Sequence, residues 1–149
     1  MNLSGGCQCG ALRFEVADGG LGKGSICHCR MCQKAFGGFF GPLITAQNSH
    51  LTWTRGAPAY FQSSNKVSRG FCQACGTPLT YVVEKDQTEL AMGAFDDPAK
   101  VPPLSQLQTS TRVPFFDGLP TLPERDLTGL EGLVSYQHPD HDTDDWPRS

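Results

Sequence analysis

The sequence lacks any long apolar run. No stretch of its 149 residues approaches the ~18 apolar residues of a membrane-spanning helix. The amino-terminal segment MNLSGGC has neither the charged nor the apolar part of a secretory signal peptide. The chain has 12 Lys and Arg and 15 Asp and Glu, which give a formal net charge of −3. The Lys and Arg residues do not cluster, so the sequence offers no basic surface to bind the phosphate backbone of a nucleic acid. These absences predict a soluble, cytoplasmic protein that binds neither membrane nor nucleic acid.

Disulfide bonds are also not expected, although the chain has seven cysteines. Cytosolic thiol buffers keep cysteines reduced, and an odd number cannot pair completely. A chain of 149 residues is long enough to bury a hydrophobic core without covalent cross-links. The seven cysteines therefore indicate metal binding or redox chemistry.

The sequence favours strands over helices, because it has 17 glycines and 11 prolines and few helix formers. Short runs of β-branched and aromatic residues, bounded by Gly, Pro, Asn or Asp, predict a mainly β fold. Short helical turns are expected after residue 30 and over 96–100. We place one domain at residues 1–120 and a loosely packed acidic tail at 121–149. The expected strands are 12–16, 39–45, 51–54, 59–62, 67–71, 79–83 and 90–95.

The cysteines form three clusters, and the CQACG segment at residues 72–76 has the clearest meaning. Two cysteines separated by two residues can bind one metal ion, while a following glycine accepts the positive φ of the tight turn. A buried apolar pair or a redox dithiol can have the same spacing. The Gly-Thr-Pro sequence at residues 76–78, however, does not start the helix that a thioredoxin-type motif requires. We interpret Cys72 and Cys75 as two ligands of a zinc knuckle.

Tetrahedral structural zinc needs four ligands, so a second pair must come from elsewhere in the chain. Cys7 and Cys9 are the natural partners, and this choice leaves Cys27, Cys29 and Cys32 as a separate group of three. A closed four-thiolate site stabilises structure, whereas three protein ligands leave a fourth position for water or a substrate. The count thus predicts one closed and one open zinc site.

The alternative is a histidine that completes the group of three and makes both sites structural. The histidines are His28, His50, His138 and His141. His28 stands between two ligand cysteines, and its side chain is expected to point away from a metal that both neighbours bind.

Three motifs together resemble the glutathione-dependent formaldehyde-activating family, also called the CENP-V/GFA domain. They are GCQCG at 6–10 followed by LRF at 12–14, CHCRMCQK at 27–34, and FCQACGT at 71–77, with a weaker similarity over 111–120. The family often has His and Trp where this chain has Gln106 and Phe115. The resemblance implies a β-tent fold of antiparallel sheets with two zinc ions per chain. It implies a structural zinc on Cys7, Cys9, Cys72 and Cys75, and a catalytic-type zinc on Cys27, Cys29 and Cys32.

The activity that this resemblance implies is that of a carbon–sulfur lyase. A small thiol such as glutathione would bind at the open zinc as a thiolate and add reversibly to an aldehyde such as formaldehyde. Arg30 is a candidate for binding a carboxylate of the thiol, although it can equally be a solvated charge on a short helix, which is the interpretation we favour for Lys34. The rival hypothesis is a non-catalytic zinc-binding module that recognises a partner. A redox switch between Cys29 and Cys32 is a third, which bound zinc would suppress.

Overall fold

The structure, a computed structural model, describes residues 1–145. In this part of the chain none of the helices has the length and apolarity that a membrane span requires. The strands are β1 (Leu3–Gly6), β2 (Arg13–Val16), β3 (Leu21–Cys27), β4 (Gly41–Gln47), β5 (Leu51–Arg55), β6 (Ala59–Gln62), β7 (Ser68–Phe71), β8 (Pro78–Val82), β9 (Gln87–Ala91) and β10 (Pro103–Leu107). The helices are α1 (Arg30–Phe36) and the short 3-10 helices η1 (Met92–Ala94), η2 (Pro98–Lys100), η3 (Thr109–Thr111) and η4 (Phe116–Thr121).

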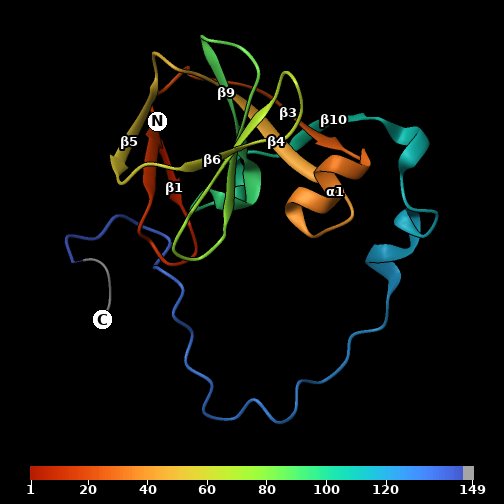
Figure 1. Cartoon of the computed structure of the whole chain (residues 1–149). Coiled ribbons are helices and arrows are strands. Elements are labelled where there is room, and N and C mark those ends of the chain that lie inside the picture. Colours follow the sequence, from red (N-terminus) through yellow and green to blue (C-terminus); the bar gives the residue numbers. More distant parts are fainter. Residues whose placement is uncertain (146–149) are drawn as a thin grey trace.

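The strands form two sheets (Figure 1). The larger sheet has the order β10-β3-β4-β9-β8-β7-β6, and the smaller has the order β1-β2-β5. The strand pairs are antiparallel except for β10, which lies parallel to β3 with Leu107 opposite Cys27. A parallel pair needs a long crossover, and here most of the domain forms that connection. The end of β10 therefore lies beside the CHC segment at residues 27–29.

The hydrophobic core draws on alternate residues of both sheets. Phe14 and Val16 of β2 and Ile44 and Ala46 of β4 belong to one buried cluster. Because successive side chains of a strand point to opposite faces, Thr45 of β4 lies on the other face of the large sheet. One face of this sheet is thus available for a site that is separate from the core.

The predicted mainly β fold is confirmed, and each predicted strand is present, the strand at 59–62 with the predicted ends and the others with shifted ends. Three strands were not predicted. β1 and β3 are rich in glycine and do not alternate clearly, and β10 begins at a proline and is exposed along its whole length. The sheets are antiparallel, as expected, apart from the pair of β10 and β3, in which the exposed strand β10 adds to the sheet edge in parallel.

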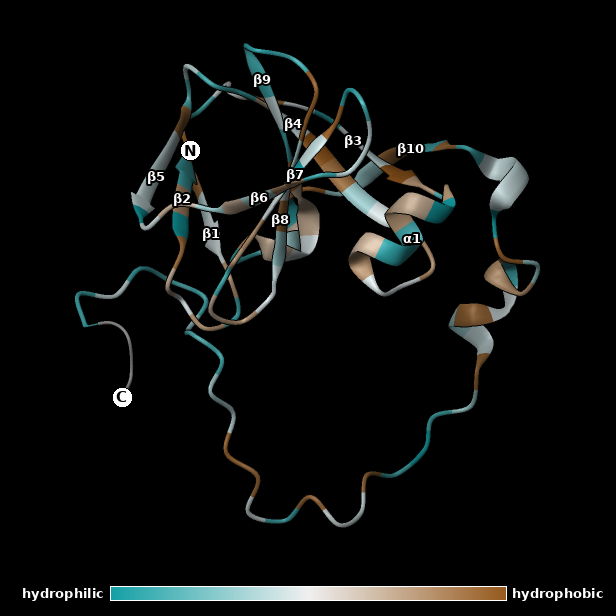
Figure 2. Cartoon of the chain, in the orientation of Figure 1, coloured by the Kyte–Doolittle hydropathy of each residue, from teal (hydrophilic) through white to brown (hydrophobic). Residues whose placement is uncertain are grey.

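The C-terminal segment leaves the domain and returns to it (Figure 1). Residues 122–137 are exposed and contain neither helix nor strand, although apolar residues recur along them (Figure 2). At His138 the chain is buried again, and its N–H donates to the Gln8 carbonyl oxygen at 2.8 Å. The segment predicted as a loose tail thus contains a packed anchor at 138–143. The boundary at residue 120 stays a prediction, and residues 146–149 of the predicted tail lie outside the described residues.

Candidate metal centres

Four of the cysteines meet where two turns face each other. Cys7 and Cys9 lie in the turn between β1 and β2, and Cys72 and Cys75 lie in the turn between β7 and β8. The four sulfurs all lie within 4.8 Å of one another. The Sγ–Sγ distances are 3.6 Å for Cys7 and Cys9 and 3.8 Å for Cys9 and Cys72. This four-cysteine cluster joins the small sheet to the large one, and its donors suit a closed tetrahedral metal ion such as zinc.

Hydrogen-bond donors surround the sulfurs of the four-cysteine cluster. The Leu12 N–H donates to Cys7 Sγ at 3.2 Å, and the Thr77 hydroxyl lies 3.1 Å from Cys75 Sγ. For the protein groups alone, burial raises the pKa of the Cys7 thiol to about 12, although the Leu12 N–H opposes it. At Cys75 burial also acts to raise the pKa, but the Thr77 hydroxyl and N–H and the Cys9 N–H lower it to about 6. A deprotonated Cys7 needs a nearby positive charge, which a metal ion supplies.

The remaining three cysteines gather at the start of α1. Cys27 ends β3, Cys29 is the N-cap of α1, and Cys32 lies one turn further on. Their sulfurs lie within 4.8 Å of one another, and the Cys32 N–H donates to Cys29 Sγ at 3.3 Å. Burial acts to raise the pKa of Cys29, but this N–H, the two neighbouring thiols and the Met31 N–H outweigh it and lower the pKa. Within residues 1–145, no His, Asp or Glu joins this three-cysteine cluster.

The loop of the three-cysteine cluster is fixed through His28, which is fully buried. Its Nε2 lies 2.9 Å from Gln106 Oε1 on β10, and its ring packs edge-on against Phe116 at 5.1 Å. Its backbone carbonyl accepts hydrogen bonds from Gln33 Nε2 and Thr111 Oγ1 at 2.9 and 2.8 Å. The His28 side chain therefore holds the loop in place from outside the sulfur cluster.

A cavity of about 240 Å³ opens beside the three-cysteine cluster. Its floor is a row of side chains across the large sheet, in which Arg69 is opposite Tyr81, Tyr81 opposite Glu89, and Glu89 opposite Thr45. Residues directly opposite on neighbouring strands share one face of a sheet. The Thr45 hydroxyl donates to Glu89 Oε1 at 2.6 Å. The cavity is lined by Lys23, Ser25, Cys27, Cys29, Met31, Cys32, Leu43, Thr45, Arg69, Tyr81, Glu89 and Leu107.

Arg69 connects this floor to the sulfurs. It is only 4% exposed, its Nη2 donates to Cys32 Sγ at 3.4 Å, and its guanidinium carbon lies 4.9 Å from the centre of the Tyr81 ring. Burial raises the pKa of the Cys32 thiol, and Arg69 opposes this shift. Burial and the thiol of Cys32 also raise the pKa of Tyr81, so its phenol is protonated at neutral pH.

Sequence reasoning grouped the cysteines as the structure does, but it missed the floor of the cavity. It named Arg30, which the structure places in a different cavity together with Lys34, and whose guanidinium donates to Gln33 Oε1. A binding role for Arg30 stays a prediction. The signal for the floor is a charged residue, Arg69, inside the predicted strand 67–71 that precedes the CQACG motif.

Residues 2–111, which include both cysteine clusters, match the family described as glutathione-dependent formaldehyde-activating enzyme. The chain belongs to this family. Its fold is also similar to the crystal structure of a Rhodobacter sphaeroides protein, a structural genomics target, with a TM-score of 0.55 and 21% sequence identity. The aligned region covers 69% of this chain and 98% of that chain, and at this identity it shows the fold alone. A search of curated proteins finds no match.

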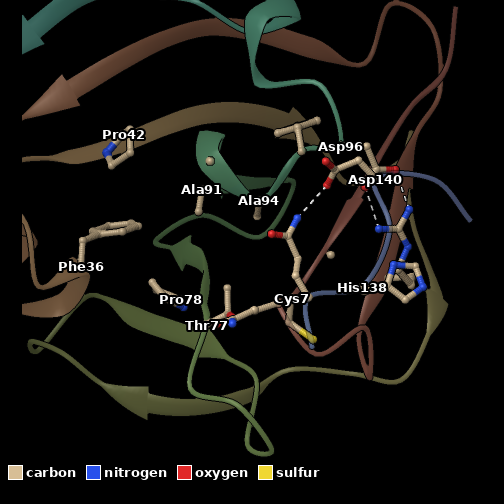
Figure 3. A pocket seen from close by; sticks show the side chains of 16 residues that line it. Cys7, Phe36, Pro42, Thr77, Pro78, Ala91, Ala94, Asp96, His138 and Asp140 are labelled. Carbon is tan, nitrogen blue, oxygen red and sulfur yellow. Dashed lines mark hydrogen bonds and ion pairs between the residues drawn. The ribbon is translucent and has the colours of Figure 1, made fainter. Parts of the chain in front are cut away.

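The match to the formaldehyde-activating family ends before residues 112–145, which we call the C-terminal extension. The extension forms one wall of a second cavity, of about 320 Å³ (Figure 3). Figure 3 shows Phe36 and Pro78 at one end of this cavity and His138 and Asp140 at the other. Cys7 of the four-cysteine cluster lines it, but none of the three-cysteine cluster does. The two cavities are therefore separate sites.

Arg13 ties this extension to the family domain. Its side chain is 4% exposed and makes two hydrogen bonds with the carboxylate of Asp96, at 2.8 and 2.6 Å. It also donates twice to Asp142 Oδ1 of the extension, at 3.0 and 2.7 Å. Burial acts to lower the pKa of Arg13, but the two carboxylates outweigh it and raise the pKa. The guanidinium is therefore charged and carries anionic partners on both sides.

Proposed function

We propose that this protein is a zinc-dependent carbon–sulfur lyase that adds a small thiol to an aldehyde and reverses the addition. The family description names glutathione and formaldehyde, which we propose as the substrate pair. The observation that carries the proposal is the cavity on the open side of three clustered sulfurs. A purely structural site needs a fourth protein ligand there rather than space for a substrate.

The donor sets suit zinc, because thiolate sulfur is a soft ligand that binds this ion well. In the proposal, one ion is structural and the other serves catalysis. When bound at the open cluster, zinc supplies the positive charge that keeps a thiol deprotonated at neutral pH. Cys7, Cys9, Cys72 and Cys75 would hold the structural ion, and Cys27, Cys29 and Cys32 would hold the other.

The proposed reaction forms one carbon–sulfur bond. The thiolate sulfur attacks the aldehyde carbon, and the π electrons of the carbonyl bond move to its oxygen. The proton that the thiol lost ends on this oxygen, which gives a hemithioacetal. The reverse reaction breaks the same carbon–sulfur bond and returns the proton to sulfur, so no oxidant or reductant is required.

The cavity offers groups that bind and orient these substrates. Met31 and Leu107 provide apolar walls. Lys23 and Glu89 provide opposite charges, which suit the carboxylate and ammonium groups of a thiol such as glutathione. The protonated Tyr81 phenol, on the same floor, is a candidate donor to the oxygen that gains charge.

The binding step is tested by replacing zinc with cobalt, whose absorption reports each added sulfur ligand. Titration with glutathione should change the spectrum of the wild-type protein. It should change that of Cys29→Ser far less, because this variant lacks one of the three clustered thiols. Lys34→Gln is the matched control, since Lys34 lies outside the cavity. A wild-type spectrum that no small thiol alters would contradict the proposal.

Catalysis is tested separately, because the uncatalysed addition is rapid. Exchange NMR at equilibrium should show faster interconversion of formaldehyde and glutathione with their hemithioacetal in the presence of wild-type protein. Cys29→Ser should give the uncatalysed rate, and Lys34→Gln the wild-type rate. Thiol binding without acceleration would favour the non-catalytic binding module instead.

A further inference from the structure

Arg69 is a buried cation whose surroundings differ from those of the other buried arginine. Arg13 has two carboxylate partners, whereas among the residues that the structure describes no carboxylate lies within ion-pair distance of Arg69. Its polar contacts are Cys32 Sγ at 3.4 Å and Ser63 Oγ, to which its Nε donates at 3.0 Å. Burying a cation without a nearby negative charge is costly. Of these two contacts, Cys32 in the three-cysteine cluster is the one that can carry the negative charge that offsets Arg69.

The charges of the open site agree with this assignment. Three thiolates and one divalent zinc ion carry a net charge of −1, and an incoming thiolate makes the net charge −2. A cation close to such a site, which is buried on one side, favours the binding of a fourth anionic ligand. Arg69 reaches both the sulfur of Cys32 and the floor of the substrate cavity.

We propose that Arg69 is the positioning residue that makes the three-cysteine site selective for anionic ligands, so that a thiolate occupies the fourth position in preference to a neutral donor. This inference rests on the proposed function, because it assumes a metal ion at the open cluster. Arg69 does not take part in bond formation. It acts through Cys32 and through its charge, which offsets the additional negative charge that the thiolate brings.

The test compares one anionic and one neutral ligand on the cobalt-substituted protein. The probes are 2-mercaptoethanol, which binds as a thiolate, and imidazole, which binds uncharged. Arg69→Met should weaken thiolate binding about 10- to 100-fold, in line with the strength of hydrogen bonds to charged groups. Its effect on imidazole should be within about 3-fold, since no charge is added to the site. Arg69→Lys, which keeps the charge, should recover part of the thiolate affinity.

Ser63→Ala is the matched control, because it removes the second polar contact of Arg69 and leaves the charge in place. It should change thiolate affinity by no more than about 3-fold. Arg69→Gln replaces Arg69→Met if the latter does not fold, since its amide can still donate hydrogen bonds but carries no charge. Circular dichroism and the cobalt bands of the four-cysteine cluster check the fold of each variant.

Equal weakening of both ligands would overturn the inference, because a merely structural role for Arg69 predicts that outcome. Unchanged thiolate binding in a folded Arg69→Met protein would overturn it as well. These results differ from failure of the proposed function, in which the wild-type protein itself binds no thiolate. The readout is ligand affinity, so it does not depend on catalytic activity.

Discussion

The Arg13 network predicts that two similar aspartate substitutions have very different costs. Asp96→Asn removes the carboxylate that accepts two N–H groups, and only 16% of this side chain is exposed. Breaking a buried ion pair by removing one partner costs about 3–5 kcal/mol. We expect about 3 kcal/mol, because Asp142 still accepts from Arg13. Asp142→Asn should cost only about 0.5 kcal/mol, since the Asp142 side chain is 58% exposed and solvent screens the interaction.

Urea unfolding followed by circular dichroism, with zinc present throughout, measures this difference. With a slope of about 2 kcal/mol per molar urea, the midpoint should fall by about 1.5 M for Asp96→Asn and by about 0.25 M for Asp142→Asn. Asp97→Asn is the matched control, because Asp97 forms an exposed pair with Lys100 at 3.6 Å. Its midpoint should stay within about 0.5 M of the wild-type value.

Two results would refute this reasoning. Equal midpoint shifts for Asp96→Asn and Asp142→Asn would show that burial does not determine the strength of each contact. The second refuting result is that Asp96→Asn lowers the free energy of unfolding by the same amount in an Arg13→Gln protein, where the ion pair is already absent. The double-mutant cycle should instead show that most of the cost depends on Arg13.

The other predictions concern metal, packing and pH. Cys72→Ser should destabilise the protein by several kcal/mol, because binding energy at a structural zinc is folding energy, whereas Cys29→Ser should leave a folded protein with one zinc ion. Elemental analysis and thermal denaturation check this, and equal unfolding of both variants would contradict the division of the sites. Gly5→Ala should cost about 2–3 kcal/mol in denaturant unfolding, since its Cβ would lie 2.4 Å from a backbone oxygen, whereas Gly93→Ala, with no atom within 4 Å, should cost under about 1 kcal/mol. Burial lowers the pKa of His138 from its ordinary 6.5, so this histidine stabilises the anchored extension above pH 6.5, and that stability is lost as the pH falls toward the folded-state pKa. Limited proteolysis of the extension should increase below pH 6.5 in the wild type, and a His138→Gln protein with the same pH dependence would exclude this cause.

The sequence predicted the grouping of the cysteines because ligand count and spacing depend on local chemistry. Cys72 and Cys75 lie in one turn, and Cys29 and Cys32 lie on one helical turn, so their proximity follows from short-range geometry alone. The predicted strands were recognised from short runs of β-branched and aromatic residues that are bounded by turn residues. Strand propensity describes Gly- and Pro-containing strands poorly, which is why β1, β3 and β10 were missed.

The floor of the cavity could not be predicted, because it depends on strand register. Arg69, Tyr81 and Glu89 come from three strands, and they share one face only through the pairing of β7 with β8 and of β8 with β9. The burial of His138 was missed for a related reason. Its partner Gln8 lies at the opposite end of the chain, and the intervening exposed residues give no sign of the return.

Because the chain returns at His138, the packed domain extends beyond the region that matches the family. The family match ends at residue 111, yet Arg13 inside the match donates hydrogen bonds to a carboxylate of the extension, and the extension forms one wall of the 320 Å³ cavity. A protein cut at the family boundary would expose the turn that holds Cys7 and Cys9 and would open this cavity to solvent. Residues 122–137, held at both ends, form a closed loop in which the cost of closure grows slowly with length. Insertions there should be tolerated, whereas removal of the anchor beyond them should not.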